Sequence, residues 1–199
     1  MLRPMTKDEI NCLEVRSYEG PVHLVRTQKA LNRAVEVLCK EPVIGFDTET
    51  RPAFKKGVSY PPSLLQMASK DDVFVFQLQH LDFPGKLLGV LEDAGIVKSG
   101  IALAYDIKEL RALSGFDPGG FVDIAEHARC CGIPHYGLRG MTAFLLGFRI
   151  SKNSQVSNWA RNDLTKSQLK YAATDAWVGR ELYLHMVDNG HIVDKKYVC

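Results

Sequence analysis

Apolar positions along the chain recur with the period of a strand in some segments and of a helix in others. Residues 21–27 alternate apolar and polar side chains, which predicts a short strand, and Thr27 is a suitable N-cap for a helix. The apolar residues of that helix recur at helical spacing: Ala30, Leu31, Ala34, Val35 and Leu38. Pro42 prevents the helix from continuing, and the apolar run 43–46 then predicts a buried strand.

The rest of the chain alternates between predicted strands and helices. Residues 63–69 and 72–78 are rich in strand formers and joined by a short connection, which favours antiparallel neighbours. The following elements are predicted in order: helix 83–95 with Gly95 as its C-cap, strand 96–103, helix 105–115, a strand and a helix within 120–132, helix 138–147, and a last helix from the N-cap Thr165 to Gly190. This order predicts an α/β fold with a mixed central β-sheet flanked by helices on both faces.

Composition restricts the class of protein. Of the 199 residues, 46% are hydrophobic and 24% are charged, which is typical of a globular chain, and the length suits one domain over residues 1–199. No apolar run reaches the ~20 residues of a membrane helix, and the N-terminus lacks a signal-peptide core, so we expect a soluble cytoplasmic protein with no membrane partner. The net charge of +2 does not by itself indicate nucleic acid as a partner.

The cysteines are odd in number and scattered along the chain. They are Cys12, Cys39, Cys130, Cys131 and Cys199. The adjacent pair Cys130 and Cys131 has only His127 and His135 nearby, so a zinc site could form there, but reduced thiols without a metal are favoured. We interpret both histidines as surface or structural residues.

Two carboxylates one residue apart end the first buried strand. Asp47 and Glu49 follow residues 43–46, and side chains at i and i+2 of a strand project from the same face, where like charges repel. A cation, a nearby Arg or Lys, or solvent could compensate for this repulsion. The carboxyl end of a central strand is also where open α/β sheets place their ligands.

Two further acids stand at unusual places. Asp106 follows a predicted strand at the start of a helix, where a first-turn acid favoured by the helix dipole is the alternative to a functional role. Asp175 lies inside the last helix, on the same face as Tyr171 and among small apolar residues, so its carboxylate needs a partner. Together with Asp47 and Glu49, these acids could converge on a site for Mg²⁺ or Mn²⁺. Two such ions are a known device for displacement at phosphorus.

Three sequence motifs resemble those of the DEDD superfamily of 3'-5' exonucleases. They are "FDTET" (46–50), "YD" (105–106) and "YAATDA" (171–176), and the Tyr four residues before the last Asp is typical of the tyrosine subgroup. The segments 45–57 and 157–177 resemble the exonuclease domain of the Werner syndrome helicase and ribonuclease D-like bacterial stand-alone exonucleases. The likeness covers about residues 20–188, the expected core of the domain.

The resemblance implies a ribonuclease H-like fold and metal-dependent hydrolysis of nucleic acid from its 3' end to nucleoside 5'-monophosphates. The expected substrate is single-stranded or 3'-recessed DNA; the alternatives are a ribonuclease D-like enzyme that trims RNA and a non-catalytic nucleic-acid-binding module. Asp47, Glu49 and Asp175 would bind one metal ion, Asp47 and Asp106 a second, and Tyr171 would orient the attacking water. Many relatives have an Asn shortly before the third acid, and the segment 100–106 has none.

Candidate substrate-binding residues surround the first motif. Thr48 lies between its two acids, and Arg51, Phe54, Lys55 and Lys56 follow in a loop that could bind phosphates and stack on a base, or could be an ordinary solvated loop.

Other residues have a weaker claim to a role. Lys152, Arg161 and Lys166 could line the far side of the cleft. Trp159 is interpreted as a packing anchor rather than a base-stacking residue. Gln66 lies in a predicted strand and could face the cleft or bond to buried backbone; the sequence does not decide between the two.

Overall fold

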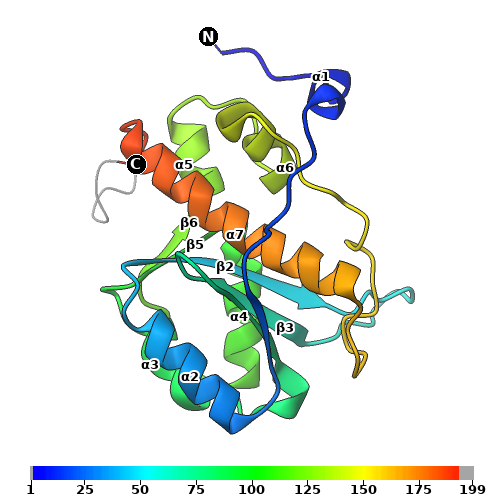
Figure 1. The fold of residues 1–199 in the computed structure, drawn as a ribbon, viewed down its shortest axis with the longest axis vertical. Helices are drawn as coiled ribbons and strands as arrows, with labels where there is room; N and C mark the ends of the chain where they lie inside the picture. The colour runs from blue at the N-terminus through cyan, green and yellow to red at the C-terminus, as the bar shows by residue number, and fades with distance from the viewer. Residues whose placement is uncertain (1, 193–199) are drawn as a thin grey trace.

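A six-stranded sheet lies at the centre of the computed structural model, which describes residues 2–192 (Figure 1). The strands are β1 (Val22–Val25), β2 (Val43–Thr50), β3 (Pro62–Ala68), β4 (Val73–Gln77), β5 (Val97–Gly100) and β6 (Phe121–Asp123). Their order is β1-β4-β3-β2-β5-β6, with β3 antiparallel to both β2 and β4 and the other pairs parallel. The predicted mixed sheet is confirmed, and β2, which carries Asp47 and Glu49, is an interior strand.

Helices cover both faces of this sheet, as predicted (Figure 1). One face packs against α2 (Gln28–Leu38), α3 (Leu88–Leu91) and α4 (Leu103–Leu113) through a core that includes Phe46, Met67 and Phe76. The other face packs against α5 (Ile124–Cys130), α6 (Leu138–Met141) and α7 (Lys166–Asp188). Strand β2, which carries Asp47 and Glu49, therefore lies between two layers of helices.

The long helix α7 lies very close to the sheet. Its N-terminus has the predicted cap, because the Thr165 hydroxyl accepts a hydrogen bond from the Gln168 backbone N–H and the Gln168 side chain accepts one from Thr165 in return. A Cβ added at Gly45 of β2 would lie 1.9 Å from the Ala176 carbonyl oxygen. Only glycine therefore permits this approach, which brings the α7 residues against the end of β2.

The predicted boundaries between residues 83 and 103 are wrong. The expected helix 83–95 is a 3₁₀ turn η2 (Gly85–Leu87) followed by the single turn of α3, and Gly95 bonds to the Asp93 side chain instead of capping a helix. Glycines at 85 and 89 weaken helix formation there. Strand β5 ends at Gly100, and Ala102, with φ +60°, turns the chain into α4, which begins two residues earlier than predicted.

Further short elements complete the chain. A π-helical segment η3 (Thr142–Leu146) continues α6, so the expected helix 138–147 is not a regular α-helix, and η1 (Leu78–His80) follows β4. The N-terminal helix α1 (Lys7–Cys12) was not predicted, although Thr6 and Glu9 have the spacing of a capping box and form one in the structure.

The segment after α1 runs along the α7 side of the sheet (Figure 1). It is fixed there by an isolated parallel bridge between Val15 and Arg149. The Met5 backbone N–H donates to His135 Nε2, which gives His135 the structural role expected of it.

The described part of the chain contains neither a membrane-spanning helix nor a metal-ligand cluster that includes cysteine. Within residues 2–192, no helix is both long and apolar enough to cross a membrane. Cys12, Cys39, Cys130 and Cys131 are exposed, and no group of potential metal ligands found in these residues contains a cysteine or histidine. Cys199 lies outside the described residues.

Candidate active site

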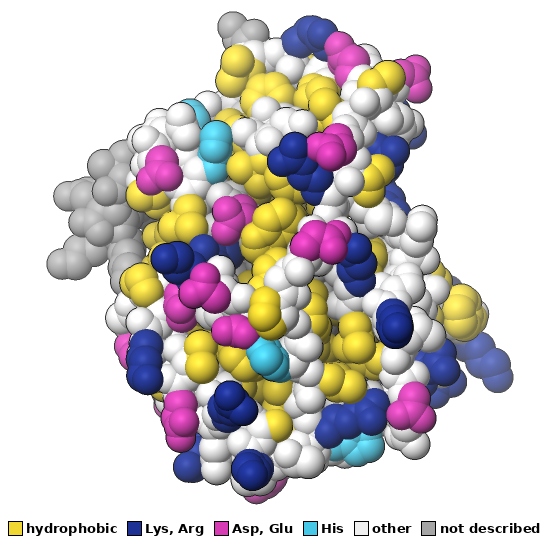
Figure 2. All heavy atoms as spheres, viewed as in Figure 1, with side chains coloured by type: hydrophobic (Ala, Val, Ile, Leu, Met, Phe, Trp, Pro, Cys, Tyr) yellow, Lys and Arg dark blue, Asp and Glu magenta, His cyan; other side chains and the backbone are white. Residues whose placement is uncertain are grey.

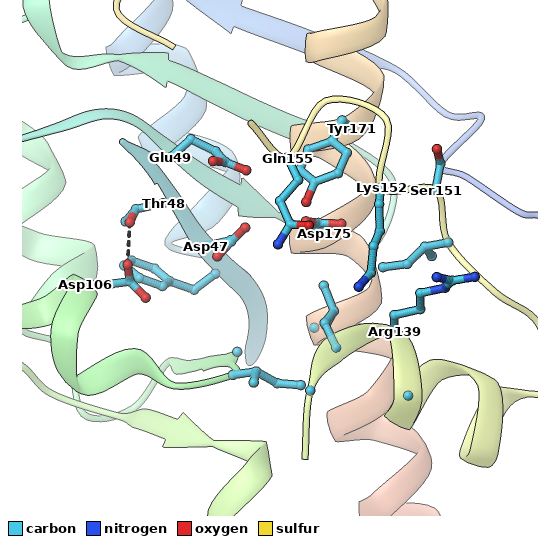
Figure 3. Close-up of a pocket in the computed structure, with 18 of the residues that line it drawn as sticks. Asp47, Thr48, Glu49, Asp106, Arg139, Ser151, Lys152, Gln155, Tyr171 and Asp175 are labelled. Carbon is cyan, nitrogen blue, oxygen red and sulfur yellow. Dashed lines mark hydrogen bonds between the residues drawn. The ribbon is translucent and has the colours of Figure 1, made fainter. Parts of the chain in front are cut away.

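Three of the four predicted acids form a compact cluster at the carboxyl end of β2. One carboxylate oxygen from each of Asp47, Glu49 and Asp175 lies within 4.8 Å of the other two. Asp47 and Glu49 project from the same face of β2, and Asp175 reaches them from α7. These three residues, together with Asp106 and Tyr171, line one pocket of about 630 Å³ (Figure 3).

The fourth acid lies in the same pocket but outside that cluster. Asp106 is in the first turn of α4, and its Oδ1 accepts a hydrogen bond of 2.5 Å from the Thr48 hydroxyl (Figure 3). Thr48 points to the opposite side of β2 from Asp47 and Glu49 because strand side chains alternate. The side chain of Thr48 thus holds Asp106 in place; Thr48 also lines the pocket, and its contact with substrate stays a prediction.

The electrostatics of the cluster favour added positive charge. Burial, followed by repulsion from Asp175 and Asp106, raises the pKa of Asp47 well above its usual value. Burial and the same kind of repulsion, first of all from Asp47, raise the pKa of Glu49 to about 10. Burial raises the pKa of Asp175 to about 7, although the Tyr171 hydroxyl lowers it. Each carboxyl group therefore resists ionisation while no cation is beside it.

The residues present fit a divalent cation. Within residues 2–192, none of the four acids forms a salt bridge with an Arg or Lys. The Asp175 Oδ1 atom is buried and has no hydrogen-bond partner, which is costly unless something else occupies that position. A set of carboxylate oxygens suits Mg²⁺ or Mn²⁺ better than the softer metals.

Tyr171 lies one helical turn before Asp175 and points into the same pocket (Figure 3). Burial, followed by the charges of Asp175 and Glu49, raises the pKa of its phenol above the usual value. The hydroxyl group therefore stays protonated at neutral pH and is available as a hydrogen-bond donor rather than as a base.

The opposite wall of the pocket carries basic and polar side chains. Lys152, which was predicted there, lines it together with Arg139 and Ser151, which were not, and Gln155, also not predicted, is drawn beside Tyr171 and Asp175 (Figure 3). Arg139 belongs to α6, and the other three belong to the connection between η3 and α7. Their local sequence does not predict a place in the pocket, because they reach it only through the packing of α6 and this connection beside β2.

Arg161 and Lys166 do not line this pocket. The Arg161 backbone carbonyl accepts a bond from Gln77, and Lys166 begins α7. Trp159 is 1% exposed and its ring lies 5.9 Å from that of Tyr171, which agrees with a packing anchor beside the site.

The loop after β2 projects from the molecule. Lys and Arg side chains gather there beside hydrophobic ones at the right edge of Figure 2, where Figure 1 places residues 51–61. Phe54 is 87% exposed, and the Arg51 guanidinium lies 4.9 Å from the centre of the Tyr60 ring. Arg51, Phe54, Lys55 and Lys56 do not line the acidic pocket, so their predicted contact with substrate would lie outside it.

Comparison with known proteins gives a consistent result. The sequence model of a family described as 3'-5' exonuclease matches residues 22–190. The chain is 30% identical over 194 residues to an exonuclease mut-7 homolog of Aedes aegypti, and the match covers 85% of this chain and 27% of that protein. It is 30% identical over 151 residues to the bifunctional 3'-5' exonuclease/ATP-dependent helicase WRN of Mus musculus, covering 71% of this chain and 10% of that one.

A further relative and a solved structure extend this likeness. Ribonuclease D of Gluconacetobacter diazotrophicus is 31% identical over 170 residues, which cover 83% of this chain and 42% of that protein. The chain therefore spans less than half the length of each of these three relatives. The crystal structure of the Aedes aegypti Nibbler EXO domain superposes with a TM-score of 0.79 at 26% identity and covers 90% of this chain and 94% of that one. The fold is the ribonuclease H-like fold predicted from the motifs.

Proposed function

This chain belongs to the 3'-5' exonuclease family, and from that premise we propose that it hydrolyses the terminal phosphodiester bond of a nucleic acid at its 3' end. The products would be nucleoside 5'-monophosphates. The observation that carries the proposal is the cluster of Asp47, Glu49 and Asp175: one carboxylate oxygen of each lies within 4.8 Å of the other two, and none of the three forms a salt bridge among the described residues.

The four acids would hold two ions of Mg²⁺ or Mn²⁺. Asp47, Glu49 and Asp175 would bind the first, and Asp106 with Asp47 the second. Such ions, when bound, neutralise the charge on the phosphate and lower the pKa of a bound water. The assignment of Asp106 is supported by its place in the same pocket and by the Thr48 hydroxyl that fixes its carboxylate.

The protein's own groups bind and orient the reacting end of the substrate. Tyr171 keeps its proton, because burial raises the pKa of its phenol, and so it orients the attacking water or a phosphate oxygen by donating a hydrogen bond. Lys152 lines the same pocket as the acids and supplies positive charge for the phosphate backbone of the substrate. Arg139 also lines the pocket and adds to that charge, with its guanidinium donating to Asn11. Gln155 adds amide donors beside them.

We propose a single-stranded or 3'-recessed DNA end as the substrate, with RNA as the second candidate. The DNA candidate is supported by the 29% identity to a DNA polymerase I of Aquifex aeolicus. The RNA candidate is supported by the 31% identity to a ribonuclease D. Matched DNA and RNA oligonucleotides in one assay would separate the two by their relative kcat/KM.

The decisive experiment is release of a labelled 3'-terminal mononucleotide from single strands in the presence of Mg²⁺ or Mn²⁺. The wild type should release it and EDTA should stop release. Asp47→Asn should lower kcat by about a thousandfold or more, because loss of a ligand shared by both ions removes several kcal/mol of transition-state stabilisation.

The matched control is Asp163→Asn, which neutralises an exposed acid that pairs with Arg26 outside the pocket. It should leave release unchanged. Binding of the oligonucleotide without any metal-dependent release by the wild type would instead support the non-catalytic binding module.

A further inference from the structure

Gln66 is a buried polar side chain that forms no hydrogen bonds within the described residues. It is 0% exposed, and neither its Nε2 nor its Oε1 atom has a hydrogen-bond partner among the described residues. A buried amide without hydrogen bonds lowers the stability of a fold, because it has lost its bonds to water and gained none in the protein. Gln66 therefore needs an explanation that packing alone does not provide.

A second buried glutamine, one strand away, shows what a structural role looks like. Gln77 of β4 is 1% exposed, and its Nε2 donates to the backbone carbonyls of Arg161 and Asn162 at 2.9 and 3.1 Å. Its Oε1 accepts from the Arg26 guanidinium. Gln77 thus joins β4 to the connection before α7, whereas the Gln66 amide bonds to none of residues 2–192.

The strand register places Gln66 beside the acidic cluster. Gln66 of β3 is the direct partner of Asp47 of β2. Its face of β3 is turned to α7, because Leu64 and Ala68, two residues to either side, pack with the α7 alanines. Asp47 is on the same face, because Gly45, two residues before it, meets the α7 backbone.

The register predicts that these two side chains lie close together. Directly opposed residues of an antiparallel pair have Cβ atoms about 4.5–5.5 Å apart, so a glutamine amide reaches the carboxyl group of an opposed aspartate. Three other buried atoms lack a partner among the described residues: Asp175 Oδ1, Trp159 Nε1 and Arg139 Nε. Asp175 and Arg139 line the acidic pocket, and the Trp159 ring lies beside that of Tyr171. The buried polar atoms without hydrogen bonds thus lie around the acids rather than throughout the core.

We propose that Gln66 is a positioning residue that donates its Nε2–H to the Asp47 carboxylate when Asp47 binds a metal ion. The inference rests on the proposed metal-dependent function. A metal-bound carboxylate is charged and has lone pairs beyond those on the ion, and a buried donor behind it fixes the orientation of the ligand. Gln66 does not touch the substrate; it acts through Asp47.

The test compares Gln66→Met with Gln77→Met, because methionine has nearly the same shape as glutamine and lacks both amide atoms. In EDTA, Gln66→Met should keep or raise the melting temperature, since it removes two unsatisfied atoms, and its dissociation constant for Mn²⁺ should rise on the order of tenfold. Gln77→Met should lower the melting temperature and leave the Mn²⁺ dissociation constant unchanged. Mn²⁺ binding is measured by electron paramagnetic resonance and needs no turnover.

A nuclear magnetic resonance measurement on the wild type keeps the test independent of how well the variants fold. The side-chain amide protons of Gln66 should shift when Mg²⁺ is added, and those of Gln77 should not. The inference is overturned if the Gln66 amide is unmoved, or if Gln66→Met binds Mn²⁺ as tightly as the wild type. A wild type that binds no Mn²⁺ would contradict the proposed function itself, which is a distinct result.

Discussion

The two walls of the pocket are built in different ways. The acidic wall consists of Asp47 and Glu49 on an interior strand and Asp175 on the longest helix, packed so closely that Gly45 is needed between them. The basic wall consists of Arg139 on a helix of four residues and Lys152 on the irregular connection that follows η3.

The difference separates two tasks. In the proposed function, the groups that would hold metal ions to within fractions of an ångström are attached to rigid elements, and the groups that would bind a flexible polymer backbone are attached to short elements and loops. Changes in the acidic wall should therefore alter turnover, whereas changes in the basic wall should alter the affinity for substrate.

Tyr171→Phe tests the acidic side and should have a larger effect than any change in the basic wall. It removes only the hydroxyl group, so we expect kcat to fall by about ten- to a hundredfold while KM and Mn²⁺ binding stay nearly constant, because orientation of a water is lost and no ligand is. Steady-state kinetics with Mg²⁺ and a Mn²⁺ titration measure the two quantities. An unchanged kcat would remove Tyr171 from the chemistry.

Combined replacement Arg139→Gln and Lys152→Ala tests the basic wall. We expect the dissociation constant for a single strand to rise about tenfold, and the slope of log K against log salt to become shallower by about 1.4, because two phosphate contacts are lost. Binding is measured by fluorescence anisotropy at several salt concentrations in Ca²⁺ or EDTA. A reduced kcat at saturating substrate with an unchanged salt slope would contradict the division between the walls.

The double variant Lys55→Ala, Lys56→Ala is the matched comparison. Both lysines follow β2 in the exposed loop, so an equal loss of slope would extend the phosphate-binding surface beyond the pocket. A slope equal to that of the wild type would mean that this loop is only solvated.

The pH dependence of stability tests the electrostatics of the acidic wall and should be the smallest effect. Because the pKa of Glu49 is raised to about 10 and that of Asp175 to about 7, the folded metal-free protein keeps protons that the unfolded chain releases above about pH 4.5. Stability is therefore greatest at acid pH and falls as pH rises towards these values.

We expect the melting temperature in EDTA to drop by several degrees between pH 5 and pH 9 and to recover when Mg²⁺ is added. Glu49→Gln should reduce the drop, because its amide has no proton to lose in this range. Scanning calorimetry on both proteins measures it, and equal pH dependence in the two would contradict the raised pKa of Glu49.

The elements that the sequence predicts well are those set by local periodicity. The strand formers in 63–69 and 72–78 indicate the antiparallel pair, and Thr27 and Thr165 are the helix caps that their positions suggest. The helix expected over 83–95 is wrong because its glycines leave only one turn.

The residues of the site also fall into those that the local sequence predicts and those that it does not. Asp47, Glu49 and Asp175 stand out in the sequence because each interrupts an apolar segment. Arg139 and Gln155 do not, because no local pattern encodes their position opposite β2. Gln66 is visible as a polar residue in a strand, but its lack of any partner emerges only once the register with Asp47 is known.

The glycine contact between β2 and α7 sets a limit on how this site can change. The carbonyl of Ala176 rests on Gly45, so the spacing between the acids of the strand and Asp175 of the helix is fixed by two backbones in contact. A larger side chain at Gly45 would lift the helix and widen the metal site, and no smaller residue exists. Substitutions at Gly45 can therefore only widen the gap between the strand acids and Asp175, whereas substitutions in the surrounding loops leave that gap unchanged.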